Sequence, residues 1–351
     1  MIKRFTKFLF IACTAVLWGC VEEDAFNNSP QGNFDALWNL IDERYCFFSH
    51  AREEFGLDWD AVRQKYSEEV KKANNGSELF NICSNMLGEL RDGHVNLSSV
   101  YGTSYYWDWQ LAHPANFSDS LQRNYLGNKF TYTAGIKYTT LPDNIGYAYL
   151  GSFEGSLNGD NITMMLINLS ATKGLILDIR NNGGGQLTSA EELASYFVNE
   201  KTHCGYIQHK TGKGHDDFST PEPLYLHPTN AFWGKLVVLL TNRGVYSAAN
   251  YFTMLLKPLP QVIVVGDTTG GGSGLPLNST LPNGWTVRFS ACPILDTAGQ
   301  HTEFGIAPHI EMHITSPDWQ RGKDTIIESA IALINYYTDK KTVHKIDYSE
   351  N

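Results

Sequence analysis

The sequence has few cysteines, and those it has do not form the spacing of a metal site. Of six cysteines in 351 residues, four lie beyond the first 20 positions and are widely scattered: Cys46, Cys83, Cys204 and Cys292. None belongs to a CxxC pair or to another common ligand spacing, so we expect no metal ion. Four cysteines allow three disulfide pairings, and the sequence does not choose among them.

The chain also lacks an excess of positive charge and the glycine motifs of nucleotide-binding proteins. Its 27 Lys and Arg residues against 37 Asp and Glu residues give a net charge of −10, which argues against binding to nucleic acid, whose phosphates select basic patches. Neither GxGxxG nor GxxxxGK(S/T) occurs, so we expect no nucleotide and no cofactor. With 42% hydrophobic and 18% charged residues, the composition is that of a globular protein of about two domains.

The N-terminus has the pattern of an export signal. Basic residues precede an apolar stretch, Phe8 to Trp18, which is too short to span a bilayer but has the length found in a secretory signal. Leu17 to Cys20 then resembles the cleavage site of bacterial lipoproteins, which implies acylation of Cys20. We expect a lipoprotein signal peptide over 1–19, a linker over 20–32, and a lipid anchor in the cell envelope. The acidic residues after Cys20 fit the outer membrane, with the protein facing the periplasm or the surface, and a solvated linker explains them equally well.

Beyond the linker, hydrophobic periodicity divides the chain into three parts. Residues 33–92 carry apolar side chains at three-to-four spacing in three helical segments with short connections, which predicts a small helical bundle. Over 93–140, β-branched and aromatic residues alternate with turn residues, which predicts a β-rich connecting segment. Residues 141–340 alternate apolar strands with helical patterns, and this order predicts parallel βαβ units in one α/β core.

The most informative segment of this core is a buried strand followed by a serine and a helix. Leu236 to Leu240 is apolar and rich in β-formers, and Ser247 to Leu256 carries apolar residues at helical spacing. A serine at such a junction can act as a nucleophile, because the free N–H groups of the first helical turn could hold the oxyanion formed at a carbonyl. The alternative is a helix N-cap, which is the commoner role of serine at this position.

Three further motifs could share a site with Ser247. In Asp92–His94, the histidine is either a general base near neutral pH or a structural residue of a turn. In Asp178–Gly185, a buried strand ends in three glycines, whose N–H groups could bind an oxyanion or form a tight turn, and we interpret the charged pair at its start as scaffold. Gly266–Gly274 is either a loop beside the site or a plain connector.

Taken in order, these motifs resemble those of the tail-specific and tricorn-core serine peptidases, and a fifth motif, Glu303–Pro308, completes the likeness. The resemblance spans about His94 to Pro308, and the helical segment before it looks like the N-terminal bundle of that family. It implies a ClpP/crotonase-like α/β catalytic core over 141–340 behind an N-terminal helical bundle. The implied activity is that of a serine endopeptidase acting on peptide or protein substrates.

Carried over motif by motif, the resemblance assigns Ser247 as the nucleophile. It assigns the oxyanion hole to the backbone N–H of Ala248 together with that of Gly183 or Gly184. Hydrolysis would then pass through an acyl-enzyme that water releases.

The resemblance also indicates which residue serves as the general base. One branch of the family uses a lysine downstream of the serine in a Gly-Lys-Gly setting, and residues 269–274 of this chain contain no lysine. The tricorn-like branch uses a histidine and a glutamate, matched here by His94 as base and Glu303 as its support. A serine precedes the histidine in that branch, whereas Gly93 stands there in this chain.

Substrate capture and two rival functions stay open at this level. Between Leu97 and Asn144 there is too little chain for the PDZ domain with which many tail-specific proteases grip a peptide C-terminus. A catalytically inactive peptide- or ligand-binding lipoprotein on the same fold is the alternative, as a resemblance to interphotoreceptor retinoid-binding protein modules allows. A lipase or esterase fits less well, since Gly244–Ala248 does not meet the GxSxG pattern.

Overall fold

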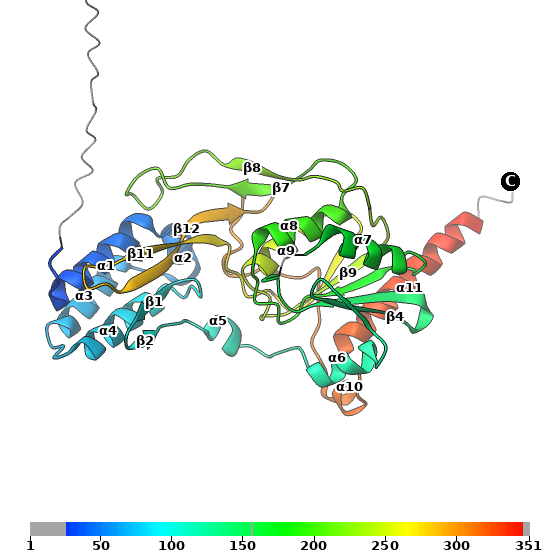
Figure 1. The fold of residues 1–351 in the computed structure, drawn as a ribbon, viewed down its shortest axis with the longest axis horizontal. Helices are drawn as coiled ribbons and strands as arrows, with labels where there is room; N and C mark the ends of the chain where they lie inside the picture. Colours follow the sequence, from blue (N-terminus) through cyan, green and yellow to red (C-terminus); the bar gives the residue numbers. More distant parts are fainter. Residues whose placement is uncertain (1–25, 156, 347–351) are drawn as a thin grey trace, which may run out of the picture.

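The computed structural model describes residues 26–155 and 157–346, which form an elongated molecule (Figure 1). Each of its two ends has a buried hydrophobic core. The N-terminal helices, drawn in blue, lie at one end against strands from the second half of the chain, and a large sheet lies at the other end. The predicted signal peptide and Cys20 fall outside the described residues. Within the described ranges, no helix is long and apolar enough to cross a membrane.

Four helices form the N-terminal end: α1 (Pro30–Arg44), α2 (Phe48–Phe55), α3 (Trp59–Val70) and α4 (Gly76–Gly88). Three of them begin at a side-chain cap, because Ser29, Asp58 and Asn75 each accept a hydrogen bond from a first-turn N–H. The expectation of three helices was wrong by one: α2 is short and mostly polar, so it carries too little apolar periodicity to be recognised.

These helices pack against an antiparallel sheet. Its strands are β1 (Asn96–Ser99), β2 (Gly102–Thr103), β7 (Thr202–Ile207), β8 (Glu222–Leu226), β11 (Gly274–Thr280) and β12 (Thr286–Leu295). The order is β2-β1-β12-β7-β8, with β11 also paired to β12. Val287, Phe289 and Ala291 of β12 share one hydrophobic core with α1 to α4. Strands from residues beyond 270 thus complete the N-terminal end, and β12 lies beside the segment that carries His94.

The second sheet has seven strands in the order β13-β10-β9-β6-β5-β4-β3. They are β3 (Thr131–Thr133), β4 (Ile136–Leu141), β5 (Ile145–Leu150), β6 (Leu175–Asp178), β9 (Val237–Thr241), β10 (Val262–Gly266) and β13 (Ile310–Glu311). The strands from β5 to β13 pair in parallel, while β3 and β4 run antiparallel. The predicted α/β class with parallel βαβ units is confirmed.

Helices cover both faces of this sheet. One face carries α7 (Gly159–Asn168), α8 (Leu187–Ala194) and α9 (Ala248–Leu256), and the other carries α6 (Asp119–Leu126) and α11 (Thr325–Ile346). In β6, Leu175 and Leu177 face the first group, whereas Ile176 faces the second. Burial on both faces explains why the central strands are continuously apolar. Two short helices, α5 (Asp108–Leu111) and α10 (Ser316–Gln320), lie in connecting segments.

Candidate active site

Ser247 lies at the turn between β9 and α9, in a backbone conformation that serine rarely adopts. Its φ of 56° and ψ of −121° place it in the left-handed half of the map, at a cost of about 1–3 kcal/mol. Its amide N–H donates to the carbonyl of Gly271 at 2.9 Å, which fixes the turn. The side chain makes no capping hydrogen bond to α9, so the simple N-cap interpretation does not hold.

The hydroxyl of Ser247 meets the imidazole of His94 instead. His94 Nε2 lies 3.0 Å from Ser247 Oγ, and the His94 side chain is only 5% exposed. Burial lowers the pKa of His94, the charge of Arg288 lowers it further, and the charge of Asp92 raises it. Because burial has the largest effect, the imidazole is neutral near pH 7 and able to accept a proton.

Asp92 is the residue that most directly holds His94, and it was missing from the expected site. Its Oδ1 accepts the backbone N–H of His94 at 2.7 Å, and its Oδ2 accepts the hydroxyl of Ser290 at 2.7 Å. The hydroxyl of Tyr246 approaches Oδ1 at 3.4 Å, and Asp92 is 1% exposed. The available signal was its place in the Asp92–His94 motif, where a carboxylate two residues before a candidate base can bond that residue's N–H.

Glu303 lies in the same buried region, but in the described part of the chain no hydrogen bond joins it to His94. Its Oε2 accepts the backbone N–H of Ser273 at 2.7 Å, and Glu303 is 3% exposed. Burial, and secondarily the charge of Asp92, raises the pKa of Glu303 well above its ordinary value. Within the described residues, His94 Nδ1 has no hydrogen-bond partner. The structure therefore brings Ser247 and His94 together and leaves Glu303 bonded to the neighbouring loop.

The absence of a side chain at Gly93 has a steric reason. A Cβ at this position would lie 2.7 Å from Trp109 Nε1 and 2.8 Å from the hydroxyl of Tyr246. The rings of Trp109 and Tyr246 stack with centroids 4.1 Å apart and fill the space that a serine would need. The departure from the tricorn-like motif thus follows from two large rings beside His94.

The glycine loop after β6 lies directly against the serine turn. A Cβ on Gly184 would lie 2.8 Å from Ser247 Cβ and 2.9 Å from the backbone nitrogen of Ala248, and Gly184 has φ +101°. The N–H of Gly184 donates to Asn182 Oδ1 at 2.9 Å. Among the described residues, the N–H groups of Gly183 and Ala248 donate to no protein acceptor. Of the candidates for an oxyanion hole, these two are the free donors.

Two other sequence motifs occupy supporting positions. Asp178 and Arg180 are fully buried and bond each other at 2.7 Å, and Arg180 also bonds Asp324 at 2.9 Å. Neither can touch a substrate, which agrees with their interpretation as scaffold. The Gly266–Gly274 loop is no plain connector, because Gly271 forms a bridge with Tyr246 and accepts the N–H of Ser247.

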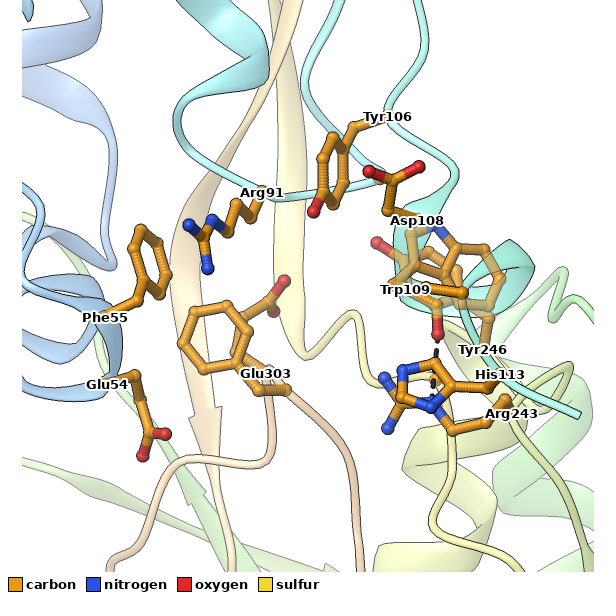
Figure 2. A pocket seen from close by; sticks show the side chains of 14 residues that line it. Glu54, Phe55, Arg91, Tyr106, Asp108, Trp109, His113, Arg243, Tyr246 and Glu303 are labelled. Carbon is orange, nitrogen blue, oxygen red and sulfur yellow. Dashed lines mark hydrogen bonds between the residues drawn. The ribbon is translucent and has the colours of Figure 1, made fainter.

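A cavity of 430 Å³ adjoins the Ser247–His94 pair. Figure 2 shows its lining, which comes from α2, α5, the turn after β9 and the Glu303 segment. Gly93 and Tyr246, the residues immediately before His94 and Ser247, both line it.

The described residues contain no metal-binding group. Across 26–155 and 157–346, no three His, Cys, Asp or Glu side chains come together as metal ligands would. Cys46, Cys83, Cys204 and Cys292 are all free thiols, so none of the three possible pairings has formed.

Two segments of the chain match known protein families. Residues 144–312 match the family described as Peptidase family S41, and residues 26–88 match the Tricorn protease C1 domain. A crystal structure from Parabacteroides merdae ATCC 43184, of a protein provisionally named a peptidase, has 49% sequence identity to this chain. It superposes with a TM-score of 0.84, covering 88% of this chain and 97% of that one.

Curated relatives give the same family at lower identity. The carboxy-terminal processing protease CtpA of Bacillus subtilis (strain 168) is 26% identical over 225 residues, which are 63% of this chain and 44% of the relative. The tricorn protease of Thermoplasma acidophilum is 28% identical over 194 residues, which are 54% of this chain and 17% of the relative. The chain therefore spans less than half the length of these two relatives.

Proposed function

Because this chain belongs to peptidase family S41, we propose that it is an exported serine endopeptidase, with Ser247 as its nucleophile and His94 as its general base. The observation that carries the proposal is the separation of 3.0 Å between His94 Nε2 and Ser247 Oγ. This is hydrogen-bond distance, as required for a base that takes the serine proton. The strained backbone of Ser247 adds support, since such strain persists where surrounding structure holds it for a function.

The reaction begins with neutral His94. As Ser247 Oγ attacks the peptide carbonyl carbon, Nε2 takes the hydroxyl proton and the carbonyl electron pair moves onto oxygen. The N–H groups of Gly183 and Ala248 bind this oxyanion. Collapse breaks the C–N bond, and the departing amine takes the proton from His94, which leaves an ester on Ser247. Water then attacks that ester with the same proton transfers and releases the acid.

Asp92 is the residue we propose as the support of His94. Accepting the serine proton makes the imidazole a cation, and the buried carboxylate of Asp92 favours that cation because it raises the pKa of His94. Its hydrogen bond to the backbone N–H of His94 also fixes the position of the backbone that carries the imidazole ring. Burial raises the pKa of Glu303, and the support that we propose for Glu303 is its hydrogen bond to Ser273, which holds that loop beside the serine turn.

Hydrolysis of a mixed peptide library, followed by mass spectrometry, tests the proposal. Ser247→Ala and His94→Ala should each lower the rate by about 10³-fold or more, because one missing member disables the unit. Ser98→Ala is a matched control, since its hydroxyl bonds only Thr103 on β2 among the residues that the structure describes. Near-normal hydrolysis in either site variant would contradict the assignment. Peptide binding without hydrolysis in the unaltered protein would favour the inactive binding lipoprotein.

We also propose that the mature chain begins at an acylated Cys20 in the cell envelope. The basic start, the short apolar stretch and the lipoprotein-like cleavage sequence at 17–20 support this. Labelling with radioactive palmitate should give a lipid-modified protein, and Cys20→Ala should abolish the label. Equal labelling of both proteins would exclude Cys20 as the anchor.

A further inference from the structure

Two arginines, Arg91 and Arg243, line the cavity near Ser247, and among the described residues neither forms an ion pair. Arg243 is partly buried, its Nε donates to the carbonyl of Trp109 at 2.9 Å, and its Nη1 donates to the carbonyl of Thr269 at 2.9 Å. Within the described part of the chain, no carboxylate oxygen lies within 4.0 Å of the Arg243 guanidinium nitrogens, the distance that defines an ion pair. A guanidinium has five N–H donors in a fixed fork, so most of this fork is free.

The environment of Arg243 makes an uncompensated charge costly. Burial lowers its pKa, and Asp267 is the acidic residue whose charge acts against this effect. A partly desolvated cation without a counter-ion gains more from an arriving anion than an exposed one does. The two carbonyls hold the side chain in place before any ligand arrives, so little entropy is lost on binding.

The cavity is also lined by three acidic residues, Glu54, Asp108 and Glu303, and by His113. Figure 2 shows His113 beside Arg243, and Glu54 at the opposite end of the cavity next to Phe55. Burial, and secondarily the charge of Arg243, lowers the pKa of His113, so this ring is neutral near pH 7. Arg91 lies at the Phe55 end, with its guanidinium 4.4 Å from the Phe55 ring centroid. Of the two lining arginines, Arg243 is the one that two backbone carbonyls hold in place.

We infer that Arg243 binds a carboxylate of the peptide substrate, either an acidic side chain or the C-terminal carboxylate, close to the bond that is cut. The inference rests on the proposed function, since it names the substrate class of that site. Three observations carry it: the free part of the guanidinium fork, its position four residues before Ser247, and the lining of the same cavity by Gly93 and Tyr246. Arginine suits this task because its fork matches the two oxygens of a carboxylate.

Equilibrium binding to the full chain carrying Ser247→Ala tests the inference without requiring turnover. The probes are octa-alanine peptides with an acetylated N-terminus and an amidated C-terminus, each carrying one Tyr for concentration measurement. In each matched pair, one of the remaining positions carries Glu in one peptide and Gln in the other, and the pairs cover these positions one by one. A further pair differs only in a free or an amidated C-terminus. The expected result is that one acid member binds about tenfold or more tightly than its neutral match, as for a charge-assisted hydrogen bond. The pair that shows the difference in affinity tells whether Arg243 binds an acidic side chain or the C-terminal carboxylate.

Two substitutions in the Ser247→Ala background locate the effect. Arg243→Gln should remove the preference for the acid peptide, while Arg91→Gln, which removes the same charge elsewhere in the cavity, should retain it. Arg243→Lys keeps the charge but not the fork of N–H donors, so it should retain only part of the preference for the acid peptide. Equal affinities within every pair in the Ser247→Ala protein would overturn the inference even if Arg243→Gln failed to fold. So would a preference that survives Arg243→Gln. A failed hydrolysis assay would count against the proposed function alone, because binding is measured separately.

Discussion

The imidazole of His94 lies 3.0 Å from the hydroxyl of Ser247, although 153 positions separate the two residues. Each comes from a different sheet: His94 precedes β1 of the antiparallel sheet, and Ser247 follows β9 of the parallel one. The pair therefore exists only where the two ends of the molecule meet. Packing between the N-terminal end and the core is a condition for the proposed chemistry.

The pH dependence of kcat/KM should report the buried state of His94. Because burial lowers the pKa of His94, the imidazole stays neutral to lower pH, and the acidic limb should reach half its maximum below the ordinary histidine value of about 6.5. Asp92 raises this pKa and Arg288 lowers it. Asp92→Asn should move the limb to lower pH and Arg288→Gln to higher pH. Shifts in the same direction would contradict the electrostatic account.

Asp92 and Glu303 should differ in their effect on the maximal rate. Asp92→Asn removes the charge that favours the imidazolium, so kcat should fall about tenfold or more, the worth of a charged hydrogen bond. Glu303→Gln keeps an oxygen that can still accept the N–H of Ser273, so kcat should change little. Steady-state kinetics at the pH optimum of each variant measure both. The opposite ranking would restore Glu303 as the main support.

Two neighbouring glycines should respond differently to alanine. Gly184→Ala would place a Cβ 2.8 Å from Ser247 Cβ at φ +101°, so it should disable hydrolysis and cost about 1–3 kcal/mol in backbone strain alone. Gly183→Ala meets nothing within 4 Å and keeps the N–H proposed for the oxyanion, so activity should persist. Kinetics and urea unfolding compare the two. Equal tolerance of both changes would mean that the loop does not approach Ser247 as described.

The stability of the core should depend on the buried ion pairs of Arg180. Arg180→Met leaves the carboxylates of Asp178 and Asp324 buried without their partner, so the free energy of unfolding should fall by about 3–5 kcal/mol. Arg321→Met removes an exposed pair with Asp318 and should cost about 0–1 kcal/mol. Urea denaturation measures both. Similar small losses would show that the buried network contributes little.

Local pattern predicted the parallel core, because strands buried on both faces are apolar throughout and helices follow them at regular spacing. Leu236 to Leu240 and the helix after Ser247 were recognised on that basis. The short polar α2 was missed for the same reason, since it offers no such period. The pairing of β1 with β12 could not be predicted, because periodicity carries no information about which distant strands meet.

The site was predictable only in part. The motifs suggested Ser247 and His94, but not Asp92, whose importance appears only when its hydrogen bonds to His94 and Ser290 are known. The choice between Gly183 and Gly184 likewise depends on which N–H is already bonded to Asn182. Such distinctions depend on which hydrogen-bond partner each polar group finds in the folded protein, and the residue types alone do not specify that partner.

The most direct test of the central claim is covalent labelling of the folded protein with a fluorophosphonate, followed by peptide mapping of the modified residue. A nucleophilic serine activated by His94 should give one adduct, on Ser247, and His94→Ala should slow its formation by about 10²-fold or more, within the range of general base catalysis. No adduct on Ser247, or an equal labelling rate in His94→Ala, would contradict the account.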